Sequence, residues 1–132
     1  MAKGKKRRIG LLTSGGDCAG LNAAIRAVVC RAVLGYGWEV VGIREGTAGL
    51  LERPPLVEEL GMHVFTGNIL RMGGTILGTV NKGDPFAYPM PDGTIVDRSN
   101  EVIEGFRELG LDGLIAIGGD GSMRILSRLC QQ

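Results

Sequence analysis

The sequence has few of the residues that mark several common classes of protein. Aromatic residues make up 5% of the 132 residues, and His63 is the single histidine. The three cysteines, Cys18, Cys30 and Cys130, are odd in number and do not form a metal-like pair, so we interpret them as reduced thiols. His63 has no cysteine or aspartate at a ligand or triad spacing, and we assign it no acid–base role.

Long apolar runs and a strong charge of one sign are also missing. No stretch approaches the roughly 20 apolar residues of a transmembrane helix, and the N-terminus lacks the apolar core of a signal peptide. The formal net charge is +1, which gives no reason to expect a nucleic acid or a membrane surface as partner. We therefore expect a cytoplasmic protein with a basic, flexible tail over residues 1–8 and one domain over residues 9–132.

Glycine and aliphatic residues are abundant, with 23 glycines and a hydrophobic content of 44%. This composition is typical of an α/β protein with tight turns between strands and helices. The residue pattern predicts strands, helices and less regular segments. The strands are expected at 9–12, 38–43 and 111–117, the helices at 21–34, 100–109 and 123–129, a short helical turn at 57–61, and a proline-rich loop or hairpin at 84–97. A strand, helix and strand in succession predict parallel pairing, and hence a Rossmann-like three-layer fold with a mostly parallel sheet.

The first predicted strand runs into a glycine-rich loop. Gly15, Asp17 and Gly20 occupy the three glycine positions of the dinucleotide fingerprint. An acid at the middle position argues against an ordinary NAD or FAD site, and no P-loop motif is present. Asp17 fits a helix cap and a ligand site equally well.

A second glycine-rich loop, Gly118-Gly119-Asp120-Gly121-Ser122, follows the strand that ends at Ile117. We expect Ser122 to cap the next helix, whose N-terminal N–H groups would face a phosphate. Asp120 beside a phosphate calls for a cation between them, and Mg²⁺ suits that position. The alternative is a plain turn capped by the aspartate.

The two loops are expected to open on the same edge of the sheet, because parallel strands end at the same side. Backbone donors and a carboxylate at one edge favour phosphoryl transfer, which is mainly positioning and charge neutralisation. A third glycine-rich segment, 71–83, carries Lys82. That lysine fits a phosphate contact and a solvated loop residue equally well.

These motifs resemble the N-terminal part of the 6-phosphofructokinases. The resemblance is carried by Ile9–Asp17 with Gly20–Arg26, by Gly73–Gly78 and by Ile117–Ser122, and it covers nearly the whole chain after the basic tail. The segment Thr79–Gly83 is similar to the subgroup that includes mixed-substrate and pyrophosphate-using members.

The resemblance implies transfer of a phosphoryl group from MgATP to the 1-hydroxyl of fructose 6-phosphate in glycolysis, by a homo-oligomer. It implies that ATP contacts Gly15, Gly16, Lys82, Gly119, Gly121 and Ser122, and that Asp120 holds Mg²⁺ and belongs to the ATP site. Gly121 favours ATP as donor, because pyrophosphate users of the family carry an aspartate there. The resemblance also shows two departures from the bacterial allosteric enzymes. Thr47 stands where they have a tyrosine that stacks near the adenine side. Arg26 matches a basic residue of their effector pocket, but Cys30 replaces the second arginine, which puts regulation through that pocket in doubt.

The catalytic base and the sugar-phosphate ligands of the family lie beyond the residues that this sequence matches. We therefore assign no catalytic residue here and expect the isolated 132 residues to be inactive, with apolar surface at the edge of the sheet. The alternatives are a pyrophosphate-dependent phosphofructokinase, a non-catalytic nucleotide-binding fragment, and the NAD-kinase or lipid-kinase relatives that share the Gly-Gly-Asp-Gly loop. The first loop and the segment Gly73–Gly78 argue against the last of these.

Overall fold

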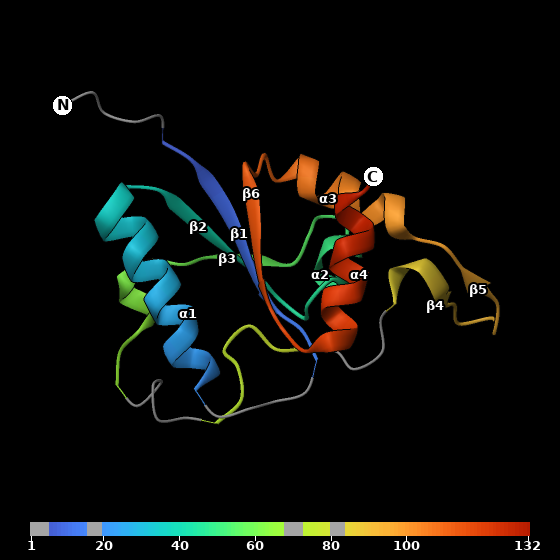
Figure 1. Cartoon of the computed structure of the whole chain (residues 1–132), viewed down its shortest axis with the longest axis horizontal. Helices are drawn as coiled ribbons and strands as arrows, with labels where there is room; N and C mark the ends of the chain where they lie inside the picture. The colour runs from blue at the N-terminus through green and yellow to red at the C-terminus, as the bar shows by residue number, and fades with distance from the viewer. Residues whose placement is uncertain (1–5, 16–19, 68–72, 80–83) are drawn as a thin grey trace.

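The computed structural model describes residues 6–15, 20–67, 73–79 and 84–132 (Figure 1). The elements in chain order are β1 (Arg8–Thr13), α1 (Leu21–Cys30), the π-helical turn η1 (Arg31–Gly35), β2 (Glu39–Ile43), α2 (Ala48–Leu51), β3 (Val57–Glu59), the 3₁₀ turns η2 (Met62–Val64) and η4 (Pro85–Ala87), β4 (Tyr88–Pro89), β5 (Ile95–Val96), α3 (Ser99–Glu108), β6 (Gly113–Ile117) and α4 (Asp120–Cys130). Among the described residues, every helix is too short or too polar to cross a membrane.

Four strands form the main sheet in the order β3-β2-β1-β6. Strand β1 pairs in parallel with both β2 and β6, so that Leu11 lies opposite Gly42 on one side and Ile115 on the other. The mostly parallel α/β sheet predicted from the sequence is therefore confirmed. Strand β3 joins the edge in the antiparallel sense.

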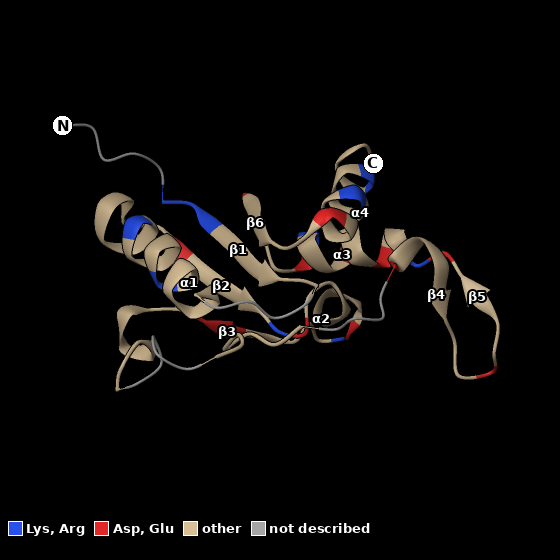
Figure 2. Cartoon of the chain, turned by 60° about the horizontal axis from the view of Figure 1, so that its bottom comes forward, with Lys and Arg blue, Asp and Glu red and all other residues tan. Residues whose placement is uncertain are grey.

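The helical turn expected at 57–61 is wrong, because residues Val57–Glu59 form β3. Val57 pairs with Ile43 and Glu59 with Val41, so the free backbone edge of β2 supplies hydrogen bonds that a short isolated helical turn could not replace. The loop or hairpin expected at 84–97 is confirmed by the β4–β5 pair, which projects from the rest of the chain in Figures 1 and 2.

Helices cover both faces of the sheet. On one face, Leu11 of β1 packs with Ile25 and Val29 of α1 in a buried apolar cluster. On the other face, Leu12 packs in a second cluster that includes Leu50 of α2 and Val102 of α3. Figure 1 shows α1 on one side of the sheet and α2, α3 and α4 on the other. The arrangement is the predicted three-layer fold.

The helices predicted at 21–34 and 100–109 are confirmed with small shifts at their ends. Helix α1 continues through η1 to Gly35, and the chain turns at Gly37, which has a φ of 68°. Helix α3 ends at Glu108, and Gly110 follows with a φ of 64°. Glycine tolerates this left-handed conformation without a Cβ penalty, so both helices end where the sequence predicts.

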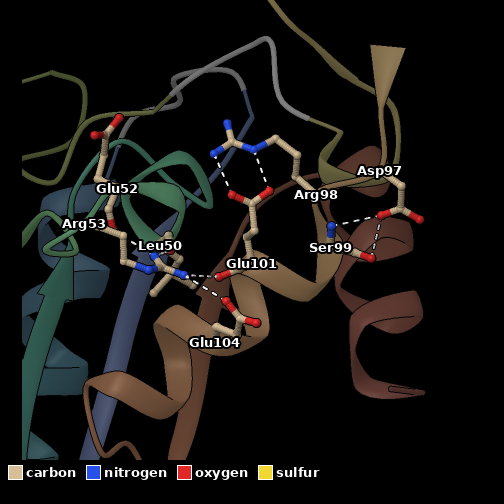
Figure 3. A network of polar contacts seen from close by, with 8 residues as sticks. All are labelled: Leu50, Glu52, Arg53, Asp97, Arg98, Ser99, Glu101 and Glu104. Atoms are coloured by element: carbon tan, nitrogen blue, oxygen red, sulfur yellow. Dashed lines mark hydrogen bonds and ion pairs between the residues drawn. The ribbon is translucent and has the colours of Figure 1, made fainter.

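The short helix α2 is fastened to α3 by Arg53, as Figure 3 shows. The guanidinium donates to the carbonyl oxygens of Leu50 at 2.7 Å and Glu101 at 2.8 Å, and Glu104 lies 3.8 Å from it. Gly105 of α3 permits this close approach, since a Cβ there would collide with the Leu50 carbonyl. The glycine-containing connection after β2 thus includes a helical turn that the Arg53 contacts hold against α3.

The basic N-terminal segment is tied to the sheet at Arg8, the last residue assigned to the tail and the first of β1. The Arg8 guanidinium lies 3.2 Å from the carboxylates of both Glu39 and Glu59, and the backbone N–H of Arg8 donates to the Asp112 carboxylate at 2.9 Å. Figure 2 shows the basic residues at the start of β1 beside acidic residues of the neighbouring strands. These ion pairs lie at the opposite end of β1 from the glycine-rich loop that follows Thr13.

Candidate functional site

The loops that follow β1 and β6 lie against each other. The Ser14 N–H donates to the Ile117 carbonyl at 2.9 Å, and the Ser122 hydroxyl donates to the Ser14 hydroxyl at 3.0 Å. A Cβ built on Gly15 would lie 3.5 Å from the Ser122 Oγ and 3.6 Å from the Gly119 nitrogen. The convergence predicted from parallel pairing is therefore present in the structure.

The start of α4 differs from the prediction. The helix begins at Asp120 with Gly119 as its N-cap, and its first hydrogen bond runs from the Met123 N–H to the Gly119 carbonyl at 3.0 Å. The expected N-cap role of Ser122 is therefore wrong. Ser122 is the third helical residue, it is 9% exposed, and its hydroxyl serves the neighbouring loop.

This arrangement leaves the amino end of α4 suited to an anion. The backbone N–H groups of residues 120–122 precede the first hydrogen bond of the helix, and no side chain of the described residues is seen to cap them. Such N–H groups, together with the positive end of the helix dipole, attract phosphate. Gly119 and Gly121 are exposed, and a Cβ at either would meet nothing within 4 Å among the described residues. A ligand can therefore approach the backbone closely here.

Asp120 places an exposed carboxylate on the first turn of α4. Among the described residues, no three His, Cys, Asp or Glu side chains gather in a group that could hold a metal ion. A single carboxylate suits Mg²⁺, which usually keeps waters and binds one or two carboxylates together with ligand phosphates. The donor set thus fits a magnesium ion that arrives with a polyphosphate.

The third glycine-rich segment contacts the place where the loops after β1 and β6 meet, which we call the junction. Thr79 donates its hydroxyl proton to the Gly15 carbonyl at 2.7 Å, and Thr13 donates to the Gly78 carbonyl at 3.0 Å. The Ile76 N–H donates to the Asn22 side chain at 2.8 Å, near the start of α1. The segment is therefore held by these hydrogen bonds and by the side chain of Leu77, which is fully buried in the core.

The structure also brings residues to the junction that the sequence did not single out. Glu45 follows β2 with a φ of 60°, unusual for a residue other than glycine, and its N–H donates to the Leu77 carbonyl at 2.9 Å. Thr13 and Thr75 link two of the loops through their hydroxyl groups. No pattern in the sequence points to Glu45. The two adjacent hydroxyl residues at the end of a strand, Thr13 and Ser14, are a pattern that could have indicated a role at the junction.

Of the predicted site residues, Gly15, Gly119, Asp120, Gly121 and Ser122 lie at this junction. Gly16 and Lys82 lie outside the described residues, as does Asp17.

A small cavity of about 10 Å³ lies at the junction, lined by Leu12, Ser14, Thr47, Ser122, Ile125 and Leu126. A larger apolar cavity of about 330 Å³ lies between α3, α4 and β6, lined by residues such as Phe106, Leu114 and Leu129. A ligand at the loops would thus be held by backbone and hydroxyl groups.

Comparison with known proteins gives a consistent result. A family model described as Phosphofructokinase matches residues 8–132. The chain is 62% identical to ATP-dependent 6-phosphofructokinase 1 of Nostoc sp. over 97% of its own length and 35% of the relative. It is 58% identical to ATP-dependent 6-phosphofructokinase 1 of Synechocystis sp., over 98% of this chain and 36% of the relative.

A solved structure agrees with the sequence matches. The crystal structure of Pichia pastoris phosphofructokinase in the T-state superposes with a TM-score of 0.78 at 33% identity, covering 97% of this chain and 13% of that one. The chain spans about a third of the length of the curated relatives that it matches.

Proposed function

This chain belongs to the phosphofructokinase family, and we propose that it forms the MgATP-binding part of an ATP-dependent 6-phosphofructokinase. The reaction is transfer of the terminal phosphoryl group of ATP to the 1-hydroxyl of fructose 6-phosphate. The observation that carries the proposal is the meeting of the loops after β1 and β6, fixed by the contacts of Ser14 with Ile117 and Ser122. Two relatives named as ATP-dependent enzymes support it.

Each predicted site residue has a role in this proposal. Gly15 and Gly16 line the phosphates from the first loop, and Lys82 contributes a positive charge. Gly119, Gly121 and Ser122 act from the second loop through backbone N–H groups at the start of α4. For Ser122 the backbone is the relevant donor, because its hydroxyl proton is used on Ser14.

Asp120 is the proposed magnesium ligand. When bound, the ion neutralises phosphate charge and helps to align the transferring group. The Asp120 carboxylate is exposed on the first turn of α4, next to the N–H groups that would hold the phosphates. The Asp120 carboxylate and the phosphates repel each other, and a cation bound by both would offset that repulsion.

The proposal assigns residues 9–132 to the phosphoryl donor and none of them to catalysis. Fructose 6-phosphate and homo-oligomer formation are proposed for the whole enzyme, with a cytoplasmic location. This division follows from the family resemblance, in which the sugar site and catalytic base lie in other parts of the protein.

The test is a calorimetric titration of the chain with ATP in the presence and absence of Mg²⁺. Asp120→Asn removes the charge while keeping the size, and we expect it to weaken MgATP binding about tenfold or more, since a charged ligand contact is lost. The matched control is Asp92→Asn in the β4–β5 turn, where the carboxylate bonds only Thr94 among the described residues. Magnesium-independent binding that Asp120→Asn leaves unchanged would contradict the proposal.

Gly121 allows the choice of donor to be tested on the same chain. Gly121→Asp introduces the residue that pyrophosphate users of the family carry, at a position where a Cβ meets nothing within 4 Å. We expect the substitution to lower affinity for MgATP by about tenfold and to leave magnesium pyrophosphate binding less affected, because only ATP occupies the space beside the α-phosphate. Parallel titrations with both ligands measure the ratio, and equal losses would argue against ATP as the preferred donor.

A further inference from the structure

The junction contains several serine and threonine hydroxyl groups, and the hydrogen bonds show which group accepts the proton of each. Each serine or threonine hydroxyl has one proton to donate, and a carbonyl oxygen can only accept. Thr79 donates to the Gly15 carbonyl at 2.7 Å, and Thr13 donates to the Gly78 carbonyl at 3.0 Å. Both protons are therefore used within the protein.

The other contacts fix the direction of two more hydroxyl groups. The Oγ1 atoms of Thr13 and Thr75 lie 2.8 Å apart, and Thr75 must be the donor because the Thr13 proton goes to Gly78. Ser122 donates to Ser14, with 3.0 Å between the two oxygens. Within the described ranges, the Ser14 hydroxyl accepts this bond and has no protein acceptor for its own proton.

Ser14 stands between the two loops that the proposed function assigns to ATP. Its backbone N–H is bonded to Ile117 at the end of β6, and its hydroxyl oxygen is held by Ser122 from the first turn of α4. A hydroxyl that accepts a hydrogen bond becomes a stronger donor, since bonds in a chain polarise one another. The remaining proton of Ser14 is therefore available and well suited to a negatively charged acceptor.

We propose that Ser14 is a further ligand-binding residue of this site, donating its hydroxyl proton to a phosphate oxygen of MgATP. The inference rests on the proposed function. It divides the hydroxyl groups of the junction into those that shape the loops, on Thr13, Thr75, Thr79 and Ser122, and the one on Ser14 that contacts the ligand. Ser127 is an exposed serine five residues further along α4 than Ser122, and it serves as a comparison outside the two loops.

The experiment compares four variants of the whole 132-residue chain by calorimetric titration with MgATP, with thermal melting followed by circular dichroism. Ser14→Ala should weaken binding about tenfold, the effect of losing one hydrogen bond to a charged group. Ser14→Thr keeps a hydroxyl and should recover most of that loss. Ser122→Ala removes the bond between the two serines but leaves the Ser14 hydroxyl, so its loss should be smaller. Ser127→Ala is the matched control on the same helix and should bind as the wild type does.

Two results would overturn the inference. One is a folded Ser14→Ala chain that binds MgATP with wild-type affinity. The other is an equal loss in Ser14→Ala and Ser122→Ala without recovery in Ser14→Thr, which would show that only the bond between the serines matters. If Ser14→Ala does not fold, Ser14→Thr must still bind more tightly than Ser122→Ala, and the reverse order overturns the inference. A wild-type chain that does not bind MgATP would instead refute the proposed function itself.

Discussion

At the scale of single residues, the positions of the junction that are glycine are glycine for different physical reasons. A Cβ on Gly118 would lie 2.7 Å from the Ser14 carbonyl oxygen and 2.9 Å from the Ser122 Cβ, whereas one on Gly121 would meet nothing within 4 Å. Gly118 is therefore required by the contact between the two loops. Gly121 is not required by the fold, which is consistent with a role in ligand approach. The sequence places both in a turn but cannot separate these reasons, because they depend on the neighbouring loop.

This difference predicts opposite outcomes for two alanine substitutions. Gly118→Ala should lower the free energy of unfolding by about 1–3 kcal/mol, the usual effect of overpacking. Gly121→Ala should leave stability unchanged or raise it slightly, because alanine is the better helix former. Urea unfolding of both variants measures the difference. Equal stabilities would show that the loops do not pack as closely as described.

The N-cap predicted at Ser122 is wrong because of the contacts of that one side chain. A serine before an apolar helical run is a common N-cap, and the sequence offers Ser122 in that position. The structure starts α4 three residues earlier, and the Ser122 hydroxyl has a partner in another loop, Ser14. The local pattern predicts a helix that follows the second glycine-rich loop, whereas its first residue depends on a contact between residues 108 positions apart.

At the scale of elements, the strands and helices with strong internal patterns were predictable and the short ones were not. Strands β1, β2 and β6 and helices α1 and α3 follow from their own apolar spacing. Strand β3 has three residues and depends on pairing with β2, and α2 depends on Arg53 and on Gly105 of α3. Elements stabilised by tertiary contacts leave a weak signal in the sequence.

The start of α3 gives a prediction for the pH dependence of stability. Arg98 donates to both carboxylate oxygens of Glu101, at 2.8 and 3.0 Å (Figure 3), and these bonds hold the pKa of Glu101 below its usual value. A carboxylate with a lowered pKa in the fold contributes stability above its unfolded pKa. That stability is lost as the pH falls through the folded pKa.

Glu101→Gln should therefore be less stable than the wild type near pH 7, by less than about 1 kcal/mol as for other exposed pairs. The two chains should become equally stable in acid, below the lowered pKa of Glu101. Urea unfolding at pH 7 and at a series of acidic pH values measures both differences. The control is Glu104→Gln, whose carboxylate lies 3.8 Å from Arg53 and is 70% exposed; a pH dependence as large as that of Glu101→Gln would count against the assignment.

At the scale of the whole molecule, the proposed function depends on which loops the topology brings together. Parallel pairing of β1 with β6 made the meeting of their loops predictable from strand order alone. The attachment of the segment 73–79 was not predictable, because it depends on single hydroxyl contacts such as Thr79 with Gly15. The apolar surface expected at the edge of the sheet is present at β6, where Ile115 is 39% exposed.

The central claim is that both glycine-rich loops hold one MgATP at the carboxyl edge of the parallel strands. It is tested most directly by recording backbone amide resonances of the ¹⁵N-labelled chain during a titration with MgATP. We predict that Gly15 and residues 119–122 shift together along a single binding curve, while Arg8 and Asp112 at the opposite end of the sheet do not move. Shifts confined to one loop, or centred on the amino end of the strands, would contradict the account.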